Sequence, residues 1–201
     1  DVAGTATEPT ASDLDSVEVV IWFTGDARSA STGPSAASET ALASWLDQGG
    51  CLLVASQDYL FARGVTSFMT SRLGVGSASE GLQQFSVTGQ NVFAGLGSYS
   101  LGGLPYTNRT DVVTPNATAL QAFTGPSTNA GVSKDTQVYR ATYWGFGLEG
   151  IGPAASRQAV LVRFLSWCAP LAALDPDADG VPNADDCAPA NGGAWALPSP
   201  A

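Results

Sequence analysis

The sequence predicts an α/β fold in which helices flank a mostly parallel β-sheet. The first observation is an alternation along the chain of apolar strand patterns and helical patterns. The second is that 44% of the 201 residues are hydrophobic, which is enough for one sizeable core and a small appendage. Such alternation is typical of parallel strands that are joined by helical crossovers.

Four segments in the first half of the chain carry the alternation. Residues 16–26 form a β-branched and aromatic run that ends in Thr-Gly-Asp, typical of a buried strand and a turn. Residues 38–50 predict a helix with Ser38 as its N-cap and paired glycines at its end. Residues 51–59 predict a second strand, and residues 65–76 a second helix.

The second half is less regular until its end. Residues 77–137 are rich in Gly, Ser, Thr and Asn, which predicts irregular β structure and loops. Residues 137–152 predict a strand followed by a turn, and residues 155–168 a helix with a broad apolar face. Because residues 1–15 are polar and turn-rich, we expect the first strand of the sheet to lie upstream in a longer parent protein.

Three consecutive parts are therefore expected. Residues 1–168 form the α/β domain, without its first strand, residues 169–190 an irregular calcium-binding loop, and residues 191–201 a linker tail.

Charge and hydropathy exclude two classes of partner. Eighteen acidic residues against eight basic ones give a net charge of −10, which disfavours nucleic-acid binding. The most apolar segment, residues 159–174, contains Arg163 and Pro170 and is too short to cross a bilayer, so no membrane insertion is expected.

Histidine is absent, which excludes Ser-His-Asp and Cys-His nucleophile activation and histidine-bound zinc. Three cysteines cannot form a four-cysteine zinc site either. Cys168 and Cys187 bracket a short acidic segment and are candidates for a disulfide, whereas Cys51 begins an apolar run and is expected to be a buried thiol.

The segment DPDADGVPNADDC, residues 175–187, has the oxygen spacing of a calcium loop. Calcium binds six to eight oxygens, and a wrapping loop supplies them from positions 1, 3, 5, 7, 9 and 12, with glycine at position 6. Gly180 stands at position 6. The predicted ligands are Asp175, Asp177, Asp179, the carbonyl of Val181, Asn183 and Asp186. The alternative interpretation is a solvated acidic linker.

Polar residues follow the predicted strands of the α/β domain. If the strands are parallel, their carboxyl ends bring Asp26, Ser56, Gln57, Asp58 and Glu149 to one edge of the sheet. A hydrolase would use Ser56, Asp58 and Glu149 there, with a base other than histidine. The alternative is that these residues only shape turns.

Four blocks resemble the class I glutamine-amidotransferase-like α/β domains of large secreted bacterial proteins. They are VEVVIWFTGD, ASWLDQGG with CLLVASQDY, YWGFGLEGI and RQAVLVRFLSWC. The resemblance implies a flavodoxin-like fold over roughly residues 10–168. Catalytic members carry a cysteine nucleophile where this chain has Ser56 or Gln57, so it also implies a non-catalytic domain. Residues 175–187 resemble a thrombospondin type 3 calcium repeat.

These features predict an accessory or interaction domain of a secreted or cell-surface bacterial protein, joined to a calcium-binding stalk repeat. Its expected partners are other modules of the same parent chain, and extracellular protein or glycan. Two alternatives stay open. One is the hydrolase described above; the other is a carbohydrate- or peptide-binding module with Tyr99, Tyr106 or Phe123 exposed along a groove.

Overall fold

The computed structural model describes residues 7–104, 106–126 and 128–169. The chain divides into two compact units, residues 1–164 and residues 165–201, and the fold described below is that of the first unit. The six predicted calcium ligands, from Asp175 to Asp186, and the linker tail lie outside the described residues.

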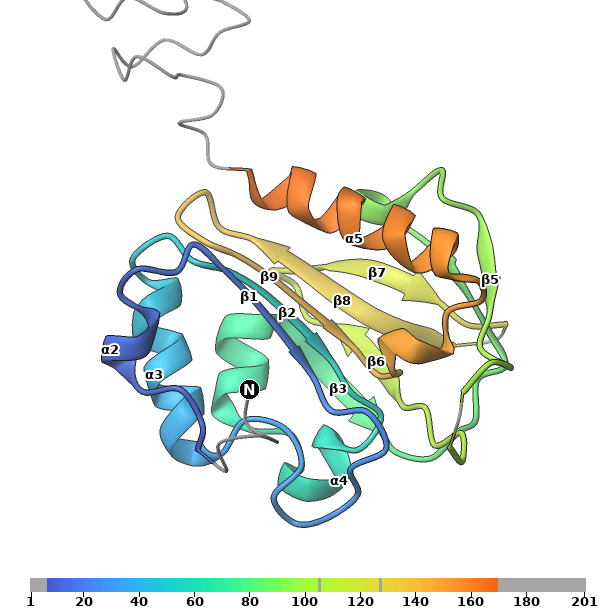
Figure 1. Cartoon of the computed structure of the whole chain (residues 1–201), viewed down its shortest axis with the longest axis horizontal. Coiled ribbons are helices and arrows are strands. Elements are labelled where there is room, and N and C mark those ends of the chain that lie inside the picture. The colour runs from blue at the N-terminus through green and yellow to red at the C-terminus, as the bar shows by residue number, and fades with distance from the viewer. Residues whose placement is uncertain (1–6, 105, 127, 170–201) are drawn as a thin grey trace, which may run out of the picture. The chain divides into compact units, whose positions relative to one another are not determined.

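An open, curled β-sheet forms the centre of the fold (Figure 1). Its strands are β1 (Val19–Phe23), β2 (Cys51–Ala55), β3 (Val75–Ser79), β4 (Ser86–Gly89), β5 (Ser98–Ser100), β6 (Val112–Pro115), β7 (Leu120–Thr124), β8 (Asn129–Asp135) and β9 (Arg140–Trp144). The spatial order is β1-β2-β9-β8-β7-β4-β5, and β6 pairs with both β3 and β8.

The helical elements are short except for two. They are α2 (Ala11–Leu14), α3 (Ala36–Leu46), α4 (Tyr59–Arg63), the π-helical turn η1 (Met69–Leu73), the 3-10 turns η2 (Asn91–Phe93) and η3 (Leu148–Gly150), and α5 (Ala154–Cys168). None of the helices in the described part of the chain has the length and apolarity that a bilayer crossing requires.

The prediction of a mostly parallel sheet is wrong for most of the sheet. Only β1, β2 and β9 form a parallel group, and β6 and β8 share one parallel pair. The pairs β9-β8, β8-β7, β7-β4 and β4-β5 are antiparallel. The reason is the length of the connections. Residues 136–139 alone join β8 to β9, and so short a link permits only an antiparallel hairpin, because a parallel pair needs a long crossover.

Helices cover both faces of the parallel strands (Figure 1). On one face, Leu42 and Leu46 of α3 and Met69 of η1 belong to a buried cluster with Leu52 and Tyr143 of the sheet. On the other, α5 contributes Val160 and Phe164, both fully buried. The helices expected in residues 38–50, 65–76 and 155–168 are thus present, because each has an apolar stripe that needs a sheet to cover it.

The N-cap of α3 is Ser35 and not Ser38 as predicted. The Ser35 hydroxyl accepts a hydrogen bond from the Ser38 backbone N–H at 3.3 Å. The Ser38 hydroxyl instead donates to the Glu8 carboxylate at 2.6 Å. The helix therefore begins one turn earlier than the sequence pattern indicates.

Strand β1 is less buried than predicted. It forms the end of the sheet and pairs with β2 on one side, and its residues Val19–Trp22 are half-buried. Phe23 is 59% exposed. The run of apolar residues in β1 is typical of a strand buried on both faces, but its place in the strand order leaves it at an edge.

The cysteine predictions are also corrected. Cys51 is buried, as expected, but it is not a thiol, because both Cys51 and Cys168 are disulfide-bonded. The sequence pattern did not reveal this oxidation, because it depends on contacts that only folding makes. Cys187, the other cysteine of the predicted Cys168–Cys187 bridge, lies outside the described residues.

Candidate functional site

The three parallel strands end together at one edge of the sheet, where the predicted site residues lie. Phe23 at the end of β1 is opposite Ala55 of β2, and Ala55 is opposite Trp144 of β9. The turns that follow therefore leave the sheet at the same edge, which is the usual ligand side of parallel strands. The antiparallel β8 does not interrupt this group, because it pairs with β9 on the far side from β2.

Ser56 is held inside the turn after β2. Its side chain is fully buried, and its oxygen accepts hydrogen bonds from the Thr24 hydroxyl at 2.8 Å and from the Tyr59 backbone N–H at 3.0 Å. A longer bond of 3.3 Å comes from the Asp58 N–H. The hydroxyl thereby ties the turn after β1 to the first turn of α4. Ser56 therefore has a structural role, because its hydroxyl holds these two turns together.

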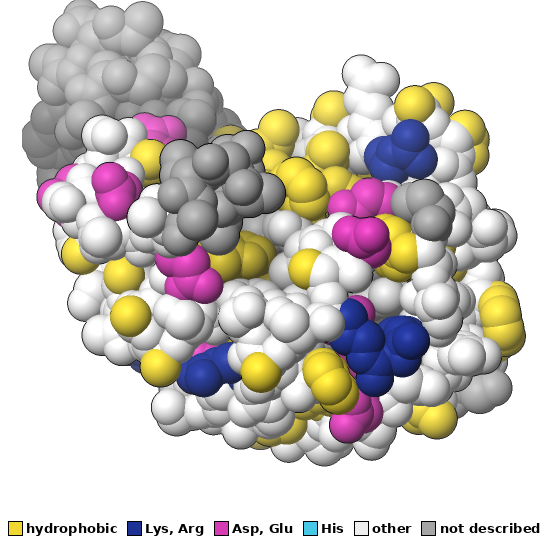
Figure 2. Space-filling model, turned by 60° about the horizontal axis from the view of Figure 1, so that its bottom comes forward, with side chains coloured by type: hydrophobic (Ala, Val, Ile, Leu, Met, Phe, Trp, Pro, Cys, Tyr) yellow, Lys and Arg dark blue, Asp and Glu magenta, His cyan; other side chains and the backbone are white. Residues whose placement is uncertain are grey.

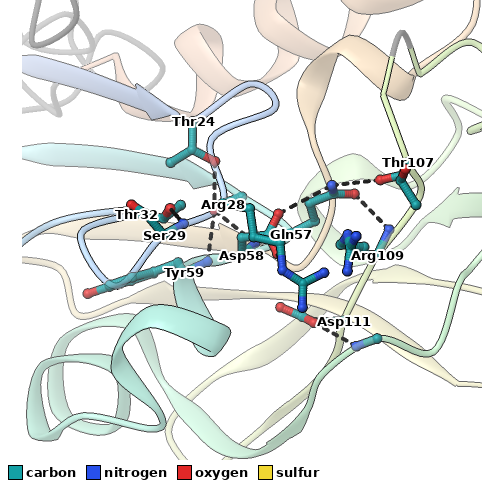
Figure 3. A network of polar contacts seen from close by, with 12 residues as sticks. Thr24, Arg28, Ser29, Thr32, Gln57, Asp58, Tyr59, Thr107, Arg109 and Asp111 are labelled. Atoms are coloured by element: carbon teal, nitrogen blue, oxygen red, sulfur yellow. Dashed lines mark hydrogen bonds and ion pairs between the residues drawn. The ribbon is translucent and has the colours of Figure 1, made fainter.

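Gln57 forms hydrogen bonds that connect residues 107–109, which are distant in sequence, to the same turn. Its amide nitrogen donates to the Thr107 carbonyl at 3.0 Å, and its amide oxygen accepts from the Arg109 N–H at 2.9 Å (Figure 3). Gln57 itself is 3% exposed, and both hydrogen bonds are partly buried. Gln57 therefore positions the loop that lines a pocket beside it.

The pocket has a volume of about 350 Å³. It is lined by Arg28, Gln57, Asp58, Glu80, Gly81, Gln83, Thr107, Asn108, Arg109 and Asp111. Figure 2 shows a face of the molecule on which a group of basic side chains lies directly beside acidic ones. Of the residues that the sequence singled out, only Gln57 and Asp58 line this pocket.

Asp58 is buried in the pocket wall beside a basic residue. The Arg28 guanidinium lies 4.0 Å from its carboxylate and also 4.5 Å above the Phe61 ring. Burial raises the pKa of Asp58, while the hydrogen bond from Gln57 and the charge of Arg28 act in the opposite direction. The hydrogen bond from Gln57 and the charge of Arg28 thus offset only part of the cost of burying the negative charge of Asp58.

Asp111 is the most perturbed group of the pocket, and no sequence pattern pointed to it beyond its place before the apolar start of β6. It is fully buried, and one carboxylate oxygen accepts from the Gly81 N–H at 3.1 Å. Its other oxygen, Oδ2, has no hydrogen-bond partner. Burial raises the pKa of Asp111 to about 8, and the nearby charges of Asp58 and Glu80 act in the same direction.

The raised pKa of Asp111 predicts how stability depends on pH. Between about pH 4 and pH 8 the folded chain holds a proton on Asp111 that the unfolded chain has released, because the ordinary pKa is 3.8. The free energy of unfolding should therefore fall as the pH rises, by at most about 1.4 kcal/mol per pH unit from this group. Urea unfolding across this range should show a shallower fall in Asp111→Asn than in the unchanged chain. An equal slope in both proteins would contradict the assignment.

Glu149 has a different partner from the one that a hydrolase would need. The Tyr106 hydroxyl donates to its carboxylate at 3.0 Å, and burial together with the charge of Glu149 raises the pKa of Tyr106. The charge of Asp26 also raises the pKa of Tyr106, so Asp26 and Glu149 both lie near the Tyr106 hydroxyl. The hydrogen bonds of Ser56 instead run to Thr24, Asp58 and Tyr59.

The aromatic side chains expected along a groove are mostly inside the protein. Phe123 is fully buried, Tyr99 is 9% exposed, and Tyr106 is half-buried. In the described residues, no three Asp, Glu, Cys or His side chains are arranged to hold a metal ion. The pocket is a candidate ligand site in this part of the chain.

No known family model and no curated protein sequence matches this chain. Solved structures do resemble it. A cytoplasmic protein of Salmonella typhimurium matches with a TM-score of 0.55 at 11% identity, over 81% of this chain and 76% of that one. A ThuA-like protein of Bacteroides uniformis matches with a TM-score of 0.50 at 13% identity, over 79% of this chain and 72% of that one.

A third structure extends the comparison to a GMP synthase. This GMP synthase component of Thermoplasma acidophilum matches with a TM-score of 0.50 at 16% identity, over 79% of this chain and 76% of that one. The fold is amidotransferase-like. At these identities the likeness shows the amidotransferase-like fold alone and assigns no activity to this chain.

Proposed function

We propose that this chain is a non-catalytic accessory domain of a larger secreted or cell-surface bacterial protein. The observation that carries the non-catalytic part of the proposal is the environment of Ser56, which together with Gln57 stands where catalytic domains resembling this one have their nucleophile. A nucleophilic hydroxyl has to reach the substrate and pass its proton to a base. Ser56 is fully buried, its oxygen accepts three hydrogen bonds, and the chain has no histidine.

The second part of the proposal is a calcium-binding stalk in residues 175–187. Its support is the spacing of Asp175, Asp177 and Asp179 around Gly180 in the sequence. Calcium would neutralise carboxylates that otherwise repel one another and would stiffen the link to the next module. The partners are then other modules of the parent chain, and extracellular protein or glycan.

Replacement of Ser56 tests the non-catalytic assignment. We expect Ser56→Ala to lower the free energy of unfolding by about 1–3 kcal/mol, because two backbone N–H groups and the Thr24 hydroxyl lose their acceptor. We also expect the unchanged chain to release no ammonia from glutamine and no nitrophenol from nitrophenyl esters or glycosides above the uncatalysed rate. Urea unfolding and absorbance assays measure the two quantities.

Thr40→Ala is the matched control, because its exposed hydroxyl bonds only the Ala36 carbonyl on the surface of α3. It should leave both stability and rates nearly unchanged. Turnover that disappears in Ser56→Ala or in Glu149→Gln, with stability retained, would contradict the proposal and establish the hydrolase alternative.

A further inference from the structure

The lining of the pocket differs from that of an ordinary ligand site. Ligand pockets are usually lined mainly by hydrophobic and aromatic side chains. Here every lining residue is polar or charged except Gly81. A ligand that fills the pocket therefore meets mainly polar groups, which disfavours acyl chains.

The charges of the lining are balanced. Arg28 and Arg109 stand against Asp58 and Glu80. Asp111, whose pKa is about 8, carries a proton on most molecules at pH 7. The lining as a whole thus attracts neither an anion nor a cation strongly, and an uncharged ligand needs no compensation of charge.

One atom of the pocket wall requires a partner. Asp111 is fully buried, and its Oδ2 is without a hydrogen bond, a costly condition for a buried polar atom. A hydroxyl group both donates and accepts, so it pairs with this carboxyl group whether or not the carboxyl is protonated. An ammonium group can only donate and a carboxylate can only accept, so each suits one protonation state of Asp111 alone.

Other residues of the pocket lining supply donors for neighbouring hydroxyls. The Arg109 backbone is fixed by Gln57, and no ion pair among the described residues involves the Arg109 guanidinium. Figure 3 shows Arg109, Arg28 and Asp111 around one space. A planar guanidinium group presents five N–H donors in a fixed fork, and the oxygens of neighbouring hydroxyls can accept from them.

We propose that this pocket binds a small, uncharged, hydroxyl-rich ligand of the size of a single sugar residue. One hydroxyl pairs with Asp111, and vicinal hydroxyls bind the guanidinium groups of Arg109 and Arg28. The volume of about 350 Å³ lies at the small end of ligand pockets and suits such a ring. This inference rests on the proposed function, since it describes binding without turnover.

Ligand-observed NMR and calorimetric titration of the full chain test the inference. The probes are the methyl glycosides of glucose, mannose, galactose and N-acetylglucosamine, with glucosamine and glucuronate as charged analogues. We expect saturable binding of at least one methyl glycoside in the millimolar range or tighter, and weaker binding of both charged analogues. Absence of binding for every methyl glycoside, or binding of the charged analogues alone, would overturn the proposal.

Two variants locate the binding. Arg109→Gln and Asp111→Ala, which removes the carboxyl group, should each weaken the binding of the glycoside at least tenfold, and the half-exposed Arg109 can be replaced without loss of the fold. Arg72→Gln, on η1 and outside the pocket, is the matched control and should leave the affinity unchanged. Unchanged affinity in both pocket variants would refute this site. Cleavage of a bound glycoside would instead refute the non-catalytic function while leaving the binding inference standing.

Discussion

Calcium is expected to bind the full chain at about one equivalent, and replacement of Asp177 and Asp179 together by alanine is expected to abolish the binding. The two residues occupy positions 3 and 5 of the predicted loop, and their loss removes two of its carboxylate ligands. Isothermal titration calorimetry should give a dissociation constant on the order of 10⁻⁴ to 10⁻³ M, the range of extracellular calcium modules. This is the largest change in binding that the sequence predicts.

Asp15→Ala with Glu18→Ala is the matched control. Both side chains are exposed, and the pair removes the same formal charge at a distance in sequence from the loop. The control should bind calcium as the unchanged chain does. If both double variants bind equally, or if the unchanged chain fails to bind at millimolar calcium, the segment is an acidic linker and the stalk proposal is wrong.

Trp144→Ala should have the largest effect on stability of the substitutions considered. The Trp144 ring is fully buried, and its centroid lies 5.4 Å from that of Phe93, 5.2 Å from Phe123 and 5.6 Å from Phe146. Its indole N–H donates to the Thr142 hydroxyl at 2.9 Å. Truncation leaves a large cavity in this aromatic cluster, so we expect a loss of about 3–5 kcal/mol in the free energy of unfolding.

Urea unfolding measures this loss, with Phe85→Ala as the control. Phe85 is also aromatic but is 65% exposed, so its replacement should change the free energy of unfolding by no more than about 0.5 kcal/mol. Equal effects of the two substitutions would contradict the burial of Trp144.

The elements with strong local patterns were predictable. α3, α5 and β2 lie where the apolar spacing placed them, because each buries its apolar side chains against the sheet. The meeting of the β1, β2 and β9 ends was predictable as well, since parallel strands share a carboxyl edge. Strand direction beyond β9 was not, because it depends on the short connections between β7, β8 and β9.

The residues that line the pocket were likewise predictable only in part. Gln57 and Asp58 follow a strand directly, so their place at the sheet edge could be inferred. Arg28 and Arg109 come from loops whose course is set by distant contacts, such as the hydrogen bond from the Arg109 N–H to Gln57. A sequence pattern carries no record of such contacts, because the partners are far apart along the chain.

By itself, the sequence determined the α/β class, the absence of histidine chemistry and the regular spacing of the acidic loop, all of which depend on composition or on neighbours along the chain. Only the tertiary structure decided that Ser56 is a buried acceptor, that Cys51 is oxidised and that Asp111 stands unpaired in a pocket wall. The physical reason is that burial, and with it the availability of a hydroxyl, a thiol or a carboxyl group, is set by residues that only folding brings near.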